Sequence, residues 1–259
     1  MSAWLPILVY HSVSDRVSPA FRRFSVSPSL FREHLEVLAE EGYRTQTLSS
    51  AAGQLVPGNG LAERTVVLTF DDAFADFAEN ALPALQAAGF AATLYVPTAY
   101  VASREAWLSR EGEPNAPVMG WDELRAAAAA GIEIGAHSHT HAELDLLAGD
   151  ALMTELARPK AILEDQLGQE VTTFAYPFGV HCARVRRGVK AAGYRTACAI
   201  GNLPASVRSD AWSLPRLPIT STTDAAQLRC MLRRRPKSSE RLHSEAKRTV
   251  RRMQRRWLA

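Results

Sequence analysis

Short apolar segments alternate with amphipathic segments along most of this chain, and this alternation restricts the possible folds more than any other feature. Segments typical of buried strands lie at 6–10, 66–70, 92–96, 132–136, 171–176, 195–200 and 214–219. Between them, apolar residues at helical spacing predict helices at about 28–41, 78–88, 150–167 and 183–192, and another helix begins at Trp121. Strands that alternate with helices in this way form mainly parallel sheets, either open or closed into a barrel.

Length and strand number narrow this choice. A chain of 259 residues, of which 47% are hydrophobic, is long enough for one α/β barrel with a substantial core. The seven or so expected strands favour a distorted (β/α) barrel over a complete eightfold one. We therefore predict an α/β protein with a single barrel domain over residues 1–228.

The remaining residues, 229–259, predict a basic amphipathic tail. Of the 30 Lys and Arg residues, 12 lie from Arg229 onward, together with only 2 of the 27 Asp and Glu residues. One stripe of a predicted helix carries the apolar residues Leu242, Ala246, Val250, Met253 and Trp257. Such a helix can bind an anionic membrane surface, or it can pack its stripe on the barrel. Nucleic acid is the third possible partner of the tail, because only the positive charge of the tail favours it.

The N-terminal segment predicts a first strand. It lacks the basic region and the long apolar region of a secretion signal. No run of about 18 apolar residues occurs in the chain. The expected location is the cytoplasm, where the tail could hold the protein at the inner face of the membrane.

Two polar motifs follow predicted strands. Thr-Phe-Asp-Asp at 69–72 ends one strand, and His-Ser-His-Thr-His at 137–141 follows another. The carboxyl ends of parallel strands gather at one end of a barrel, which is where such folds place their chemistry. Two His residues and one Asp can hold a catalytic divalent metal with one coordination position open. The second Asp is then available as a base.

The residues alone leave alternatives open. Asp71 or Asp72 could simply cap the next helix, and alternating histidines could be surface loop residues. In an extended chain His137, His139 and His141 share a face, whereas a helical turn brings only the first and last together. Spacing therefore does not choose the two ligands.

Together these motifs resemble the first two motifs of the polysaccharide deacetylases (the NodB-homology domain, carbohydrate esterase family 4). Tyr-Pro-Phe-Gly at 176–179 is similar to the third motif, and the resemblance covers about 65–219. It implies a distorted (β/α) barrel and metal-assisted hydrolysis of N-acetyl groups. The family's second motif, His-Ser/Thr-x-x-His, implies His137 and His141 as metal ligands together with Asp72. The implied metal is a divalent ion, with Zn²⁺ expected, and the implied base is Asp71.

The same resemblance implies roles for residues of the third and fourth motifs. The backbone N–H of Phe178 would stabilise the oxyanion. The Tyr176 ring would pack on the sugar, with a place in the core as the alternative. Asp-Ala-Trp at 210–212 faintly resembles the fourth motif, so Trp212 is a further expected sugar contact.

The chain departs from the family pattern in two places. No Arg accompanies the third motif, so Arg216, at the end of a late strand, is the candidate to orient Asp71; the alternative is a plain surface Arg. No Leu-x-His segment follows the last strand to supply a general acid. A group of these proteins opens with Tyr-His, as this chain does at residues 10 and 11. We therefore expect His11 to be the acid, with a core histidine as the alternative.

The expected function is metal-dependent N-deacetylation of an N-acetylated poly- or oligosaccharide, a lipid-linked glycan included. The first alternative is another carbon–nitrogen amide hydrolase on the same scaffold. The second is a glycan-binding module without turnover. Outside these motifs, His34 and His181 are interpreted as incidental residues of a helix surface and a loop, and Asp76 as a helix N-terminal residue.

Overall fold

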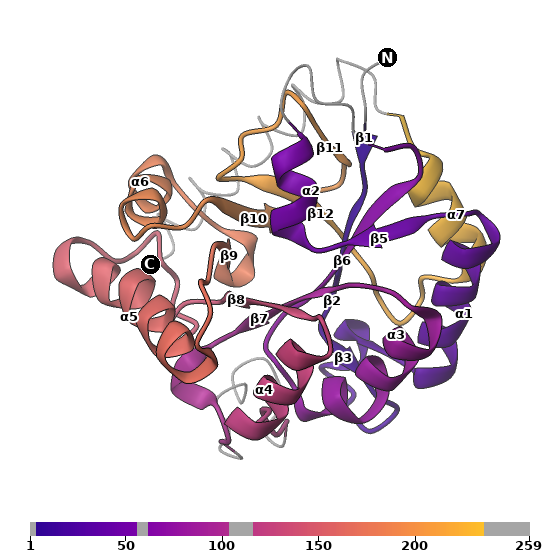
Figure 1. Cartoon of the computed structure of the whole chain (residues 1–259), viewed down its shortest axis with the longest axis horizontal. Coiled ribbons are helices and arrows are strands. Elements are labelled where there is room, and N and C mark those ends of the chain that lie inside the picture. Colours follow the sequence, from indigo (N-terminus) through magenta and orange to yellow (C-terminus); the bar gives the residue numbers. More distant parts are fainter. Residues whose placement is uncertain (1–3, 56–61, 104–115, 236–259) are drawn as a thin grey trace.

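The computed structural model describes residues 4–55, 62–103 and 116–235 (Figure 1). Within them, seven parallel strands close into a barrel: β2 (Ile7–Tyr10), β6 (Thr65–Phe70), β7 (Thr93–Val96), β8 (Glu133–Ala136), β9 (Thr173–Ala175), β10 (Thr196–Ile200) and β12 (Leu214–Pro218). Strand β2 pairs with β12 on one side and with β6 on the other, so the first barrel strand completes the ring. This arrangement confirms the predicted distorted (β/α) barrel.

Shorter strands lie beside this ring. Strand β5 (Arg44–Gln46) pairs with the first half of β6. Strands β1 (Trp4–Leu5) and β11 (Ala205–Ser206) form an antiparallel pair, and β3 (Ser12–Val13) runs parallel to β4 (Ser25–Val26). The two short pairs involve two residues per strand, which is too few for a periodic pattern, and sequence analysis missed them.

Most of the helices surround the barrel, whereas α2 lies over its middle in this view (Figure 1). In chain order they are α1 (Pro28–Glu40), α2 (Leu48–Gln54), α3 (Leu82–Ala88), α4 (Trp121–Ala129), α5 (Gly149–Leu167), α6 (Ala183–Ala191) and α7 (Ala225–Arg233). Short helical turns are η1 (Arg22–Phe24), η2 (Phe77–Ala81), η3 (Thr98–Tyr100) and η5 (Pro177–Gly179). Helix α1 begins as predicted, because the Ser27 hydroxyl accepts a hydrogen bond from the N–H of Leu30 and Pro28 occupies the first turn.

The helix predicted at 78–88 is divided in two. A π-helical turn, η2, precedes α3, and Pro83 lies in the first turn of α3. Proline has no backbone N–H and therefore cannot continue a regular α-helical hydrogen-bond ladder through this point.

Alternation along β6 decides which side chains enter the barrel. Val66, Leu68 and Phe70 belong to the core between the strands and the helices, whereas Val67 belongs to a separate cluster inside the barrel. Because successive strand side chains point to opposite faces, Thr69 and Asp71 follow Val67 toward the interior. Helix α2 and the β1–β11 pair contribute Leu48, Leu5 and Ala205 to the same inner cluster. They cover the end at which the strands begin, and the opposite end holds the polar motifs.

Helix α7 crosses the predicted boundary between barrel and tail. It packs against α1, where Arg229 contacts Glu40 at 2.5 Å and Arg233 contacts Glu41 at 2.5 Å. The hydroxyl of Tyr43 also donates to the carbonyl of Leu232 at 3.1 Å. The apolar stripe predicted for the tail lies outside the described residues.

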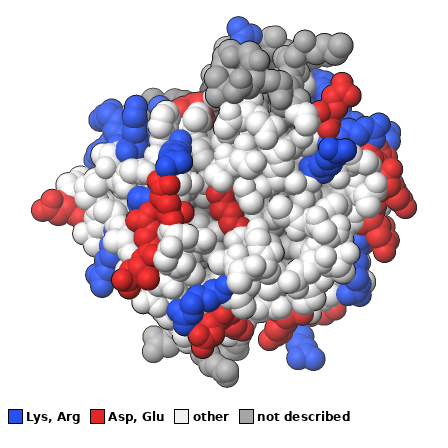
Figure 2. Space-filling model, viewed as in Figure 1, with Lys and Arg blue, Asp and Glu red and all other residues white. Residues whose placement is uncertain are grey.

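The described surface carries both signs of charge. On the face shown in Figure 2, basic and acidic side chains are interspersed around the rim. In the part of the chain that the structure describes, every helix is too short or too polar to cross a bilayer.

Candidate active site

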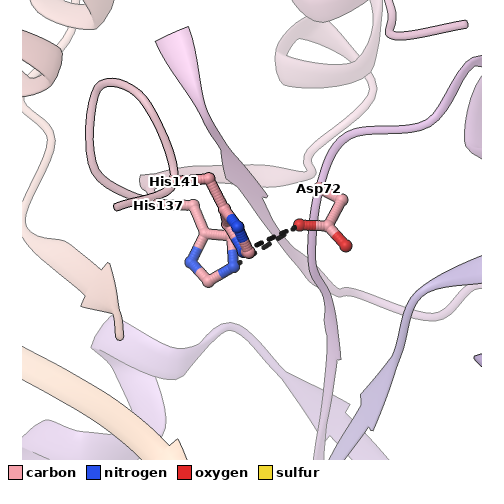
Figure 3. A group of neighbouring side chains, drawn as sticks. All are labelled: Asp72, His137 and His141. Atoms are coloured by element: carbon pink, nitrogen blue, oxygen red, sulfur yellow. Dashed lines mark ion pairs between the residues drawn. The ribbon is translucent and has the colours of Figure 1, made fainter. Parts of the chain in front are cut away.

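The two adjacent aspartates point to different partners. Both are buried, with 3% of Asp71 and 4% of Asp72 exposed. Asp71 continues the inward side of β6, and its N–H donates to the carbonyl of Tyr10. At Asp72 the backbone turns into the left-handed region, with φ of 75°. This turn directs the second carboxylate toward the histidine motif (Figure 3).

Asp72, His137 and His141 bring three possible metal ligands together (Figure 3). The Nε2 atoms of His137 and His141 each lie 3.5 Å from Oδ1 of Asp72. Ligands bound to Zn²⁺ at about 2.1 Å with tetrahedral angles lie about 3.4 Å apart. Both distances to Asp72 therefore match those of a small divalent-cation site, and all three ligand atoms lie within 4.8 Å of one another.

Each histidine presents the form that binds metal. Nδ1 of His137 donates to the carbonyl of Ala175 at 2.8 Å, so its Nε2 carries the lone pair that faces Asp72. Burial lowers the pKa of His137, although the Asp71 carboxylate opposes this change. Burial also lowers the pKa of His141 well below its usual value. Neutral imidazoles are what a divalent metal requires.

His139 lies outside this group. Its Nδ1 is 2.9 Å from the hydroxyl of Thr98, whereas its neighbours in the motif supply the ligand atoms that face Asp72. The loop reaches this arrangement through two residues with left-handed backbone, Ser138 at φ 62° and His141 at φ 56°. Spacing alone did not choose which two of the three histidines face Asp72. The bent loop favours His137 and His141, because it brings the first and last imidazoles together.

Arg216 holds Asp71 with two hydrogen bonds. Its Nη1 and Nη2 donate to the carboxylate oxygens at 2.6 and 2.7 Å, and Nη1 also donates to the hydroxyl of Thr69 at 3.2 Å. Arg216 is completely buried, so it is not a plain surface Arg. Burial raises the pKa of Asp71, but Arg216, together with His137 and His11, outweighs burial and holds that pKa below its usual value. Asp71 is therefore ionised at neutral pH.

His11 follows β2 directly, next to the end of β6. Tyr10 pairs with Phe70 in the sheet, so His11 and Asp71 follow neighbouring positions at the same end of the barrel. The imidazole lies against the Phe24 ring, with centroids 5.3 Å apart. Burial lowers the pKa of His11 to about 4, although Asp71 opposes this and Arg216 adds to it. The imidazole is consequently neutral at pH 7 in the protein alone.

The third motif places one aromatic side chain at the surface and one in the core. Phe178 is 39% exposed, has left-handed backbone with φ of 58°, and packs its ring against His141 with centroids 4.6 Å apart. Tyr176 is completely buried, and its hydroxyl donates to the carbonyl of Trp212 at 2.8 Å. This burial fits the core alternative for the Tyr176 ring. The Trp212 ring lies 4.8 Å from the ammonium group of Lys190.

Two acidic residues near the site have contacts that sequence analysis missed. Asp76 accepts from the hydroxyl of Ser12 at 2.5 Å and from the N–H of Val13 at 3.1 Å, instead of capping its own helix. Glu155 of α5 accepts hydrogen bonds from the histidine loop. A sequence signal existed for Glu155, since it lies among Leu152 and Leu156 on the buried face of a predicted helix.

The fold and the site together define a class: a closed (β/α) barrel with a candidate divalent-metal site beside an ionised carboxylate. The family profile described as polysaccharide deacetylase matches residues 58–197, more than half of the chain. The chain belongs to the polysaccharide deacetylase family, which confirms the resemblance drawn from the three motifs.

Individual relatives agree with this membership. YxkH of Bacillus subtilis (strain 168), a provisionally named polysaccharide deacetylase, is 28% identical over 193 residues, 74% of this chain and 63% of that protein. The poly-β-1,6-N-acetyl-D-glucosamine N-deacetylase of Escherichia coli (strain K12) is 36% identical over 78 residues, 30% of this chain and 12% of that protein. The chain thus spans less than two thirds of the length of either relative.

A solved structure resembles most of the fold. The deacetylase PplD of Streptococcus pyogenes, in complex with acetate, superposes with a TM-score of 0.79 and 26% sequence identity. The match covers 90% of this chain and 100% of that one.

Proposed function

We propose that this protein is a metal-dependent N-deacetylase that hydrolyses the acetamide groups of N-acetylated sugars in a poly- or oligosaccharide. One observation carries the proposal: Asp71 is bound by Arg216, while the adjacent Asp72 faces two histidines. A site that only binds glycan needs neither a separate ionised carboxylate nor a metal centre. The name of the Escherichia coli relative supports this substrate class, and the acetate-bound Streptococcus pyogenes deacetylase supports deacetylation.

Asp72, His137 and His141 would hold the cation. Zn²⁺ is our proposed metal because two imidazoles and a carboxylate are common zinc ligands. When bound, the ion would supply Lewis-acid chemistry at the acetamide carbonyl. The Ala175 carbonyl would keep Nε2 of His137 free of a proton and directed at the site.

Asp71 would take the proton from the attacking water. Arg216 keeps this carboxylate ionised and fixes both of its oxygens. A residue held in this way can accept a proton at a defined position. The reaction then breaks the bond between the carbonyl carbon and the sugar nitrogen and releases acetate and a free amine.

Phe178 and His11 would complete the chemistry. The left-handed backbone at Phe178 belongs to a short exposed turn next to His141, where its N–H could donate to the oxyanion. His11 would protonate the leaving amine. Because its pKa is lowered to about 4, His11 must take up that proton during the reaction, and the proton that Asp71 removes from the attacking water would be its source.

Acetate release from N-acetylglucosamine oligomers tests the proposal. The wild-type protein should release acetate, lose this activity with a chelator and regain it with Zn²⁺. Asp71→Asn should abolish turnover without abolishing metal binding, whereas Asp122→Asn, an exposed carboxylate on α4 with its side chain 98% exposed, should behave as wild type.

Two other results would point to the alternatives. Oligomer binding without acetate release in the metal-loaded wild type would indicate a glycan-binding module. Hydrolysis of small acetamides without any release from sugars would indicate a different amide hydrolase.

A further inference from the structure

Glu155 is a charged residue in an otherwise apolar position. It lies on the buried face of α5, a helix that contacts β8, and only 7% of it is exposed. Leu152 and Leu156, its neighbours on that face, are core residues. A buried carboxylate is costly unless it is hydrogen-bonded, so the partners of Glu155 indicate why the residue is there.

All three partners that the structure gives to Glu155 lie in the histidine loop. Oε2 accepts from the backbone N–H of His139 at 2.9 Å and from that of Thr140 at 2.8 Å. Oε1 accepts from the hydroxyl of Thr140 at 2.7 Å. Hydrogen bonds to an ionised carboxylate are shorter and stronger than neutral ones. One side chain on α5 thus holds two of the three residues between His137 and His141.

The backbone of the histidine loop adopts an unfavourable conformation, which needs contacts to hold it. Ser138 and His141 both have left-handed backbone, which residues other than glycine adopt at a cost. Other bonds hold the loop carbonyls: the N–H of Ala99 donates to the carbonyl of His139, and the hydroxyl of Tyr100 to that of Thr140. Glu155 holds the amide groups instead. Together these contacts fix the bend that sets both Nε2 atoms 3.5 Å from Asp72.

We propose that Glu155 is a positioning residue for the metal site, which acts by holding the loop between the two histidine ligands in its bent form. The inference rests on the metal site of the proposed function. It concerns metal affinity and therefore stands or falls separately from deacetylation.

Calorimetric titration of the metal-free protein with Zn²⁺ tests this role. Glu155→Gln keeps the shape of the side chain but has one acceptor oxygen in place of two. We expect Zn²⁺ affinity to fall by about 10- to 100-fold, the usual effect of removing an outer-shell partner. Glu164→Gln is the matched control. Glu164 lies on the same helix and accepts from the N–H of Val171 at 3.0 Å, away from the loop, so its variant should bind Zn²⁺ as wild type.

Thr140→Val provides a second, milder test. It removes the hydroxyl that donates to Glu155 and leaves both backbone bonds. Its affinity loss should be smaller than that of Glu155→Gln, and the double variant should lose less than the two losses combined, because both substitutions act on one interaction. Thermal melting of each metal-free variant shows whether it is folded at the titration temperature. If Glu155→Gln does not fold, the Zn²⁺ affinity of Thr140→Val tests the positioning role instead.

The outcomes separate the two proposals. The positioning role is overturned if folded Glu155→Gln binds Zn²⁺ with wild-type affinity, even if this variant melts at a lower temperature. If Glu155→Gln does not fold, the same result in Thr140→Val overturns it. Weakened affinity supports it, whether or not the wild type releases acetate. Absence of acetate release from the Zn²⁺-loaded wild type overturns the proposed function alone.

Discussion

Arg216 reaches Asp71 across the interior of the barrel, and the two residues form a buried, doubly hydrogen-bonded pair. Their strands, β12 and β6, are not neighbours, because β2 lies between them. The guanidinium also lies 5.5 Å from the centre of the Tyr95 ring. From the sequence, Arg216 is the candidate to replace the Arg missing from the third motif. In the structure its side chain contacts the expected base directly.

Replacing Arg216 with Lys should loosen the orientation of Asp71 and weaken the effect that keeps its carboxylate ionised. Lys keeps the charge but cannot make two parallel bonds to a carboxylate. Losing charge-assisted bonds of this kind costs about 1.5–3 kcal/mol, so kcat/KM for acetate release should fall about 10- to 100-fold. The pKa of Asp71 should rise toward its usual value, which moves the acidic limb of the pH–rate profile to higher pH. Steady-state kinetics across pH measures both effects.

Arg195→Lys is the control for this substitution. Arg195 also makes two bonds to one carboxylate, that of Glu170, but its side chain is 70% exposed. Exposed pairs contribute about 0–1 kcal/mol, so this variant should keep wild-type activity and pH dependence. An unchanged profile in Arg216→Lys would contradict the orienting role.

The two histidines flanking Thr140 should respond differently to alanine. His141→Ala removes a proposed ligand and should lower Zn²⁺ affinity by more than the about 100-fold typical of outer-shell losses. His139→Ala removes only the bond to Thr98 and should bind Zn²⁺ nearly as well as wild type. Calorimetric titration compares them directly. Equal losses would mean that the ligand assignment is wrong.

Asp76 should make the stability of the protein depend on pH. Burial raises the pKa of Asp76 to about 6 from 3.8, although bonds from Ser12 and Val13 lower it. A raised folded-state pKa stabilises the protein below the unfolded value, and this contribution is lost as pH rises through the folded value. The free energy of unfolding of wild type minus that of Asp76→Asn should therefore decline from about pH 4 to about pH 6 and then level off. Denaturant titrations at several pH values measure this difference, and a flat difference would refute the shift.

Gly135 should not tolerate a methyl group. A Cβ there would lie 2.5 Å from the Tyr95 ring and 2.6 Å from the Thr173 hydroxyl, inside the barrel. Overpacking of this kind costs about 1–3 kcal/mol, and the strain arises two residues before His137. Gly53→Ala, on helix α2 with open space around it, should instead be neutral or stabilising by up to about 1 kcal/mol. Chemical denaturation of both variants checks the contrast; equal stability would contradict it.

Local patterns predicted the seven barrel strands and most helices, because each depends on backbone geometry within a few residues. The alternation in β6 places Val67, Thr69 and Asp71 on one face, and packing in the structure shows that this face is the inner one. Position at the carboxyl end of a parallel strand likewise gathers the aspartates and histidines at one end. The resemblance of the three motifs to those of the polysaccharide deacetylases then implied membership of that family.

Tertiary structure decided the contacts that link distant segments. His34 was expected on a helix surface, yet it is completely buried, with Nδ1 3.2 Å from the Tyr10 hydroxyl and Nε2 2.6 Å from the Thr223 carbonyl. The pairing of Arg216 with Asp71 likewise depends on closure of the ring through β2. Spacing along the chain determines which way a side chain points. Which partner it meets depends on how all the strands and helices pack at once, and no local pattern contains that information.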